Sequence, residues 1–265
     1  SAASDVYKRQ HTISVLKERD DITPEFGSEP IDICKSRKDE AEKDALRHAA
    51  NINDMAVEFG IKHISPDLDE LTLSSMIEEF FEEHGAVQDM QLQYVCYGKN
   101  AAEPHHGAVA GEMLHDGDAV LFDLWAPINN YWCDMTRTVF YKSVSEEHRK
   151  VYEIVKEAQQ AAIDFVKPGV KMSDIDAVAR KVITDAGYGE YFLTRTGHGV
   201  GMTVHEPPEA SPSCDLIAEP GMCFSIEPGI YLKDDVGVRI EDLVIVTEDG
   251  CEVLTKYPKD LQIVE

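Results

Sequence analysis

The order of helix-like and strand-like segments is the feature that most narrows the folds open to this chain of 265 residues. Apolar residues recur at helical spacing from residue 36 onward, in two segments that are expected to end at Gly60 and Gly85. Strand-like runs follow at residues 94–97, 119–122 and 136–141. The same order returns about 100 residues later, with helices that end at residues 168–169 and at Gly187, and with strands at residues 222–225, 229–232 and 238–246. Two copies of helix, helix and strands predict an internally duplicated α+β domain, whose site would draw residues from both copies.

The composition favours a soluble protein that avoids polyanions. Fifty Asp and Glu residues against 25 Lys and Arg residues give a formal net charge of −25, which would repel nucleic acid and anionic membrane surfaces. No apolar run approaches the roughly 18 residues that a membrane helix needs. The six cysteines are scattered, with no CxxC pair. We therefore expect a cytoplasmic protein with reduced thiols, and neither nucleic acid nor a membrane as its partner.

Two aspartates flank a turn-like Pro-Ile-Asn-Asn sequence at residues 127–130. Asp123 closes the apolar run Ala-Val-Leu-Phe, and Asp134 lies eleven residues further on, close enough for a hairpin to return it beside the first. Two aspartates near a turn are often only solvated or capping residues. An acid that closes an apolar strand is costly unless its charge is matched, however, because desolvation opposes ionisation of a buried carboxylate.

The second copy adds three candidates for the same site. His198 lies between two glycines, where the missing side chains would let a ligand or metal approach the imidazole closely. Glu227 follows one strand and directly precedes Pro-Gly. Glu241 is expected inside a strand, with Arg239 on the same face two residues earlier. A glutamate in an apolar strand needs a partner for its charge.

If these four carboxylates converge, their mutual repulsion requires cations. Like charges 4 Å apart repel by roughly 4 kcal/mol per pair at an effective dielectric constant near 20. Two divalent ions would cancel the four charges. Four carboxylates and one imidazole are too rich in oxygen for a structural zinc site, and they suit manganese, cobalt or catalytic zinc.

Five motifs in chain order carry a family resemblance: PHH, D…DMTRT, GHGVG…VHEPP, SIEPGIY and GVRIED. Together they resemble the pita-bread metallopeptidases, and most of all the Xaa-Pro dipeptidases (prolidases) and the aminopeptidases P, over roughly residues 35–260. The resemblance implies a pita-bread (creatinase/aminopeptidase-like) fold, with internally duplicated helix pairs around a curved antiparallel sheet. It also implies five metal ligands, of which Asp134 and Glu241 bridge two ions: Asp123, Asp134, His198, Glu227 and Glu241.

The resemblance implies four residues with a part in catalysis: His105, His205, Glu227 and Arg239. His105 would help to hold the substrate and the developing tetrahedral centre, whereas the histidine that follows it is a bystander. His205 would contact the scissile peptide, and Glu227 would pass a proton to the proline nitrogen. Arg239 would orient Glu241.

The implied activity is hydrolysis of the Xaa-Pro bond, most of all in dipeptides, by a hydroxide that bridges two divalent metal ions. Manganese is the expected metal, with cobalt or zinc as alternatives. The partner would be a small peptide with proline at its second position, because a site shaped around the tertiary amide can reject ordinary peptides. A homodimer is expected for the full-length protein.

The chain departs from the resemblance in its turn and in its length. Relatives often read Asp-x-Gly and Gly-Tyr-x-Ser-Asp, whereas this chain has DLW at residues 123–125 and NYWCD at residues 130–134. Residues 1–10, SAASDVYKRQ, resemble the translation of a sequencing adapter and are interpreted as a non-native tail. Residues 11–35 are interpreted as the remnant of an N-terminal domain and linker, and residues 36–265 as the metallopeptidase catalytic domain.

Four alternatives stay open. An aminopeptidase P would remove the residue before proline from longer peptides, and sequence does not separate it from the dipeptidase. Methionine aminopeptidases share the fold, but they lack an Arg two residues before the last glutamate, where this chain has Arg239. Metal-free binding proteins and creatine-hydrolysing relatives of the same fold lose metal ligands, whereas all five positions are filled here.

Overall fold

The computed structural model describes residues 14–17, 19, 21, 28–87 and 93–265. The chain divides into two compact units, Ser1–Cys34 and Lys35–Glu265. Helix α2 (Ser28–Ser36) begins in the first unit, and every element below belongs to the second. The predicted non-native tail, residues 1–10, lies outside the described residues, as do residues 11–13, 18, 20 and 22–27 of the predicted remnant. The assignment of residues 11–35 to another domain stays a prediction.

The first copy of the predicted pattern forms two helices and three strands. They are α3 (Glu40–Lys62), α4 (Glu70–Glu83), β1 (Tyr94–Tyr97), β2 (Ala119–Ile128) and β3 (Tyr131–Tyr141). Side chains fix both helix starts: Asp39 and Glu42 form a capping box, and Asp69 accepts a hydrogen bond from the backbone N–H of Thr72. A short 3-10 helix, η1 (Gly98–Ala102), follows β1.

The second copy repeats the order with helices α5 (Glu146–Phe165) and α6 (Met172–Asp185) and the 3-10 helix η2 (Gly189–Tyr191). The strands that follow are β4 (Gly197–Gly199), β5 (Glu206–Ala210), β6 (Cys223–Ile226), β7 (Gly229–Leu232), β8 (Val236–Arg239), β9 (Asp242–Val246), β10 (Cys251–Val253) and β11 (Ile263–Val264). The predicted α+β order and its repetition are confirmed.

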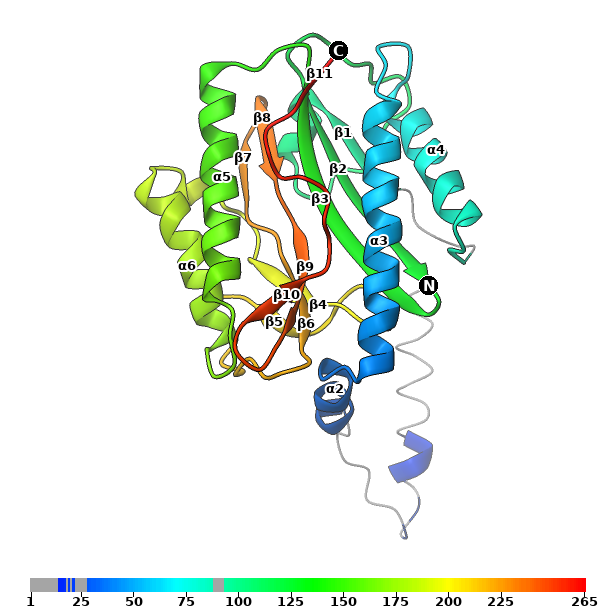
Figure 1. Ribbon diagram of the computed structural model, residues 1–265, viewed down its shortest axis with the longest axis vertical. Coiled ribbons are helices and arrows are strands. Elements are labelled where there is room, and N and C mark those ends of the chain that lie inside the picture. Colours follow the sequence, from blue (N-terminus) through cyan, green and yellow to red (C-terminus); the bar gives the residue numbers. More distant parts are fainter. Residues whose placement is uncertain (1–13, 18, 20, 22–27, 88–92) are drawn as a thin grey trace. The chain divides into compact units, whose positions relative to one another are not determined.

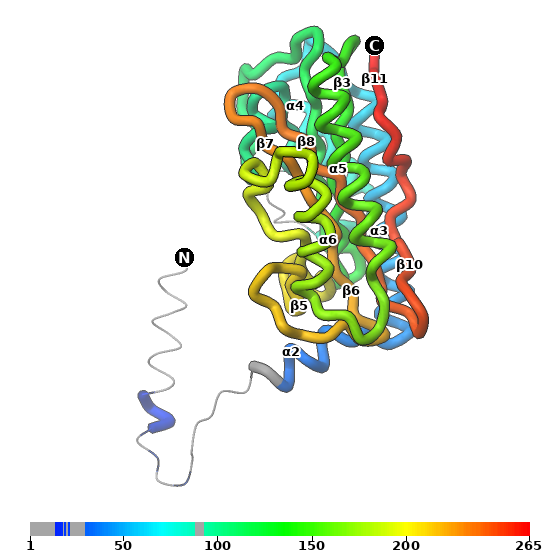
Figure 2. Tube along the Cα trace, turned by 90° about the vertical axis from the view of Figure 1, so that its left-hand side faces the viewer, coloured from blue at the N-terminus to red at the C-terminus, as the bar shows by residue number. Residues whose placement is uncertain are grey.

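The strands form three hydrogen-bonded sheets, in the orders β1-β2-β3-β11, β10-β9-β6-β4-β5 and β7-β8. Neighbouring strands are antiparallel except for β11, which runs parallel to β3. Figure 1 shows α3 and α4 on one side of the strands and α5 and α6 on the other. In the view turned by 90° (Figure 2), α3, α5 and the chain end at β11 lie along one side of this unit, and β5 and β7 toward the other.

Two of the hydrophobic clusters are each built around the helix pair of one copy, although the second also includes residues of β1, β2 and β3. One cluster joins α3 and α4 to β1–β3 and contains buried Ile77 and Phe122. The other joins α5 and α6 to β6, β8 and β9 and contains buried Val155 and Phe224. Gly60 was expected to end the first helix, but α3 continues to Lys62. A Cβ atom at Gly60 would lie 2.9 Å from both Ile77 and Phe122, so this glycine allows the helix to pack closely and is not its end.

The helices are amphipathic, with one apolar stripe toward the core and a charged outer face. Helix α5 buries a stripe that includes Val151, Val155, Ala158 and Ala162. Across the described parts of the chain, every helix is too short or too polar to cross a lipid bilayer. The helices therefore gain their stability from one-sided burial against the sheets.

Candidate active site

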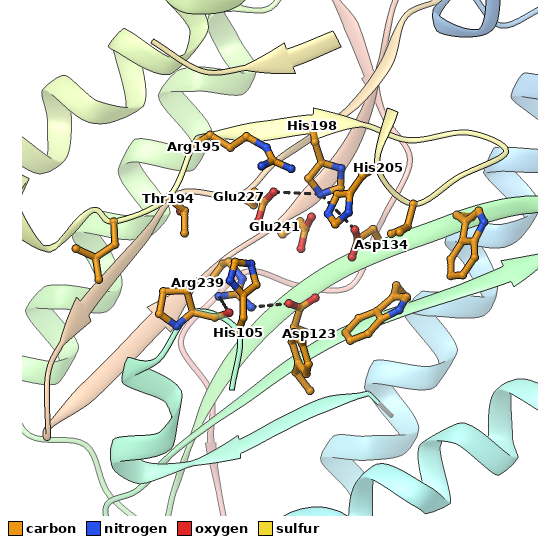
Figure 3. A pocket seen from close by; sticks show the side chains of 16 residues that line it. His105, Asp123, Asp134, Thr194, Arg195, His198, His205, Glu227, Arg239 and Glu241 are labelled. Atoms are coloured by element: carbon orange, nitrogen blue, oxygen red, sulfur yellow. Dashed lines mark hydrogen bonds and ion pairs between the residues drawn. The ribbon is translucent and has the colours of Figure 1, made fainter. Parts of the chain in front are cut away.

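A cavity of about 550 Å³ is lined by residues from both copies of the pattern (Figure 3). All of the site residues predicted from the sequence line it: His105, Asp123, Asp134, His198, His205, Glu227, Arg239 and Glu241. The cavity is of a size typical of small-molecule sites. The residues converge as expected, and the role of each stays a prediction.

Asp123 and Asp134 lie on one face of the β2–β3 hairpin. The strands pair so that Asp123 faces Thr136 and Trp125 faces Asp134, which puts all four on the same face because cross-strand partners point the same way. The turn consists of Asn129 and Asn130, both with positive φ, as a two-residue hairpin loop requires. The expectation that the first strand ends before Asp123 is wrong, because β2 continues to Ile128.

His198 occupies the short strand β4 and points toward two carboxylates. Its Nε2 atom lies 3.2 Å from Glu227 Oε1 and 3.5 Å from Asp134 Oδ2 (Figure 3). Its Nδ1 atom lies 3.2 Å from the carbonyl oxygen of Gly199, an arrangement that places the proton on Nδ1 and leaves the lone pair of Nε2 free. Burial lowers the pKa of His198 to about 4, so the ring is neutral near pH 7.

The glycines beside His198 serve packing and not ligand access, which corrects the expectation from the sequence. A Cβ atom at Gly197 would lie 1.8 Å from the carbonyl oxygen of Ser225, and one at Gly199 would lie 2.3 Å from that of Glu206. Neighbouring strands therefore approach β4 more closely than any side chain permits. The backbone N–H of His198 also donates to Ser225 Oγ at 3.0 Å. These contacts fix the position of the imidazole.

We expect Gly197→Ala to lower the free energy of unfolding by about 3 kcal/mol, because the new methyl group would overlap a backbone oxygen that cannot move cheaply. Gly250→Ala is the matched control, since a Cβ atom there meets nothing within 4 Å, and it should change stability by less than about 0.5 kcal/mol. Urea unfolding of the 265-residue chain measures both. Equal stability of the two variants would contradict the close packing of β4.

Glu227 and Glu241 stand opposite each other, one residue beyond the paired stretch of β6 and β9. The last pair in that ladder is Ile226 with Asp242. The backbone N–H of Glu227 donates to the carbonyl of Thr196 at 2.7 Å, and that of Glu241 to the carbonyl of Thr136 at 3.1 Å. Glu241 was expected inside one continuous strand, but residues 240–241 separate β8 from β9. Glu241 lines the cavity from this break between the two strands.

The clustered carboxylates resist ionisation. Burial, followed by the charge of Glu241, raises the pKa of Asp134 well above its usual value. Burial, followed by the charge of Glu227, does the same for Glu241. The pKa of Glu227 rises to about 7, mainly because of burial. The protein alone therefore does not hold these groups as anions at neutral pH, and positive charge from another source would favour their ionised forms.

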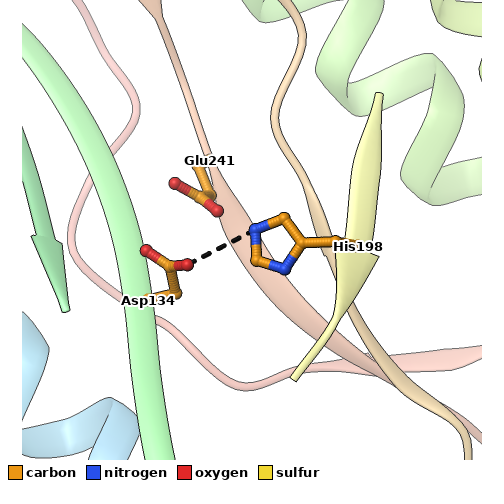
Figure 4. Close-up of side chains that lie close together, drawn as sticks. All are labelled: Asp134, His198 and Glu241. Carbon is orange, nitrogen blue, oxygen red and sulfur yellow. Dashed lines mark ion pairs between the residues drawn. The ribbon is translucent and has the colours of Figure 1, made fainter. Parts of the chain in front are cut away.

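The donor set fits divalent metal ions. Ligand atoms of Asp134, His198 and Glu241 all lie within 4.8 Å of one another (Figure 4). Thr136 Oγ1 donates to Glu241 Oε2 at 2.7 Å, whereas the buried Glu241 Oε1 has no hydrogen-bond partner among the described residues. A buried carboxylate oxygen without a partner is costly, and a cation would satisfy it. Oxygen-rich donors with one imidazole suit hard or borderline ions.

Arg239 pairs with Asp123 and not with Glu241. Its Nη2 atom lies 2.6 Å from Asp123 Oδ2, and its Nη1 atom donates to the Tyr231 hydroxyl at 2.8 Å. Its Nε atom donates to Thr136 Oγ1 at 3.1 Å, and the same hydroxyl donates to Glu241. Arg239 therefore reaches Glu241 only through Thr136, and its role in orienting Glu241 stays a prediction.

The histidines of the motifs differ in their surroundings. The ring of His205 lies edge-on to that of His198, with centroids 4.2 Å apart; the residue is exposed, and partial burial of its ring lowers its pKa to about 4. His105 lines the cavity but is exposed. His106, the expected bystander, does not line the cavity, and its Nδ1 atom lies 3.2 Å from Glu103 Oε2.

Several residues that shape the site were not found from the sequence. Glu206, next to His205, is anchored by the buried Nζ atom of Lys38 at 2.7 Å, and Thr136 connects Arg239 to Glu241. Arg195 also lines the cavity. Lys38 lacks a distinguishing pattern, whereas Thr136 belongs to the DMTRT motif and Arg195 lies three residues before His198, so both positions carried a usable signal.

Comparison with known proteins agrees with this geometry. The sequence matches the model of metallopeptidase family M24 over residues 44–248. It is 44% identical over 227 residues to the Xaa-Pro dipeptidase of Lactobacillus delbrueckii subsp. lactis, a match that covers 85% of this chain and 61% of that protein. The chain spans about three fifths of the length of such curated relatives.

Solved structures show the same fold. Prolidase from Pyrococcus furiosus superposes with a TM-score of 0.84 at 37% identity, covering 86% of this chain and 67% of that one. A histidine-to-alanine variant of Escherichia coli aminopeptidase P gives a TM-score of 0.78 at 25% identity, covering 85% of this chain and 57% of that one. These neighbours confirm the pita-bread fold that the motifs predicted.

Proposed function

Because the chain belongs to metallopeptidase family M24, we propose that it is a dinuclear-metal peptidase that hydrolyses the Xaa-Pro bond, most of all in dipeptides. The observation that carries the proposal is the convergence of the predicted residues in one cavity around Glu241, whose Oε1 atom has no hydrogen-bond partner among the described residues. Similarity to an Xaa-Pro dipeptidase and to a prolidase supports the choice of substrate. The metal-free binding role is disfavoured, because a binding protein has no need for clustered buried carboxylates.

The residues that would hold two divalent ions are Asp123, Asp134, His198, Glu227 and Glu241. When bound, such ions polarise a peptide carbonyl and activate a water molecule. Manganese is the proposed metal, because four carboxylates make the site rich in oxygen donors. The neutral imidazole of His198, with a pKa of about 4, is available as a ligand without losing a proton first.

Side chains of the cavity would transfer the proton, bind the substrate and position the metal ligands. Glu227 lies in the cavity with its Oε1 atom 3.2 Å from His198 Nε2, and it is the carboxylate proposed to pass a proton to the proline nitrogen. His205 stays neutral and can donate a hydrogen bond to a substrate carbonyl. Arg239 holds the Asp123 carboxylate in place. His105, exposed at the cavity, is positioned to contact the substrate.

Aminopeptidase P activity is the second candidate, since the E. coli enzyme shares the fold. The two activities differ in whether the substrate ends at proline or continues. We also propose a cytoplasmic location and a homodimer for the full-length protein, as expected from the family resemblance.

The length of the substrate tests the proposal. We expect the manganese-loaded chain to hydrolyse Ala-Pro with a kcat/KM at least about tenfold above that for Ala-Pro-Ala, because the dipeptide end would be recognised in the cavity. Ala-Ala controls for selection of proline and should be hydrolysed poorly. Preference for the longer peptide would replace the dipeptidase assignment by aminopeptidase P. No hydrolysis of any of these peptides by metal-loaded protein would overturn the peptidase function.

A further inference from the structure

Arg195 is a cation at the cavity whose side chain finds no partner among the described residues. It lies between η2 and β4 and lines the cavity with Thr194. Within the described part of the chain its guanidinium makes neither an ion pair nor a hydrogen bond, and its Nε atom is buried without a partner. The other arginine of the cavity, Arg239, is paired with Asp123. A buried donor without a partner is costly. We therefore expect the guanidinium of Arg195 to bind an acceptor group of a ligand.

The backbone around Arg195 is clamped on both sides. Arg180 on α6 donates to the carbonyl oxygens of Phe192 at 3.2 Å and Thr194 at 2.9 Å. On the other side, Asp176 accepts hydrogen bonds from the backbone N–H and the hydroxyl of Thr196, at 3.1 and 2.8 Å. The segment that presents Arg195 is therefore held before any ligand arrives, which reduces the entropy lost on binding.

Thr194 adds a second unpartnered group beside Arg195. Its Oγ1 atom is buried and has no hydrogen-bond partner among the described residues. Figure 3 shows Thr194 and Arg195 near His198 and Glu227. The charge of Arg195 also reaches Glu227, whose pKa it lowers against the larger effect of burial. A hydroxyl and a guanidinium together form a donor pair suited to a carboxylate.

We propose that Arg195, assisted by Thr194, binds the free α-carboxylate of the C-terminal residue of a two-residue substrate and so restricts the site to dipeptides. The inference rests on the proposed function and names the group that selects substrate length. Two divalent ions would balance the four acids of the cavity, so none of these acids would be left to neutralise Arg195, and unlike Arg239, which contacts Asp123, Arg195 makes no ion pair among the described residues. A longer peptide replaces the charged carboxylate by a neutral amide, and the ionic part of the contact is lost.

The test compares Ala-Pro with Ala-Pro-amide, which differ only in that charge, in the manganese-loaded 265-residue chain. We expect the chain to favour Ala-Pro, and Arg195→Met to lose about 30- to 100-fold in kcat/KM for Ala-Pro, mainly through KM. The kcat/KM for Ala-Pro-amide should change less than about threefold, so that Arg195→Met hydrolyses the two substrates with similar kcat/KM. Arg195→Lys should recover part of the preference, because it keeps the charge but not the fork geometry.

Controls separate binding from structural damage. Arg149→Met changes an exposed arginine on α5 and should leave both substrates unaffected. Metal content and thermal midpoint are measured for each variant and should match the unsubstituted chain. Calorimetric binding of free proline but not of prolinamide, lost in Arg195→Met, would show carboxylate binding without relying on turnover.

The outcomes distinguish this inference from the proposed function. Equal losses for Ala-Pro and its amide in Arg195→Met, or no preference between them in the unsubstituted chain, would overturn the carboxylate role and leave the peptidase function standing. If no peptide is hydrolysed, the peptidase function fails. Calorimetric binding of Ala-Pro that is tighter than that of the amide, and only when Arg195 is present, would still support the inference.

Discussion

Glu241→Ala is expected to abolish turnover and to remove at least one of two bound metal ions per chain, without destabilising the metal-free protein. Glu241 contributes an unpartnered buried oxygen and raises the pKa of Asp134 through its charge. Its removal therefore relieves repulsion among buried acids while it deletes a proposed bridging ligand. Turnover, metal content by elemental analysis, and thermal unfolding with and without Mn²⁺ measure the three effects.

In the unsubstituted chain, metal at 100 times its dissociation constant should stabilise the fold by about 2.7 kcal/mol, and Glu241→Ala should lose most of that gain. Glu248→Ala is the matched control, because Glu248 is an exposed residue outside the cavity. Loss of turnover with both ions retained would argue against the bridging assignment. A large fall in the stability of the metal-free variant would show that Glu241 serves the fold and not the metal.

Metal binding should release protons, and the apparent affinity for the metal should therefore rise with pH. In the metal-free protein, burial raises the pKa of Glu227 from its usual 4.5 to about 7, and metal binds only the ionised form. Below pH 7 the ion must therefore displace a proton, so apparent affinity falls with falling pH. For Glu227 alone the change between pH 5 and pH 7 is about 50-fold, and the raised pKa values of Asp134 and Glu241 make it larger.

Calorimetry in two buffers of different ionisation enthalpy counts the protons released at pH 6. His198, with a pKa of about 4, is already neutral there and should contribute almost nothing. Glu227→Gln should reduce the release by about one proton, because the amide carries no ionisable proton. An affinity that does not change between pH 5 and pH 7 would contradict the raised pKa values.

Much of the architecture followed from the pattern of the sequence. The repeated order of helices and strands predicted the duplicated α+β fold, because apolar periodicity reflects which face of each element is buried. The ends of helices and strands were predicted less accurately than their order. The expected stop at Gly60 failed because that glycine permits close packing against Ile77 and Phe122, and periodicity does not distinguish a packing glycine from a terminating one.

The residues that line the cavity were also predictable from the sequence. The strand lengths and contacts that position them were not. Asp123 and Asp134 were placed together from a hairpin signal, but the strands extend past both acids to a turn at Asn129 and Asn130. Polar residues facing the cavity interrupted the apolar pattern, so β2 was predicted too short. The glycines beside His198 were read as an opening for a ligand, whereas they accommodate the backbone of neighbouring strands.

By itself, the sequence supplied the acids and histidines that line the cavity, because the hardness, charge and titration of carboxylates and imidazoles are properties of residue type. The tertiary structure decided how they are connected. It paired Arg239 with Asp123, placed Thr136 between Arg239 and Glu241, and left Arg195 facing the cavity with no partner among the described residues. Those outcomes depend on distances between segments roughly 100 residues apart in the chain, and such distances are set by the packing of two copies of one motif against each other.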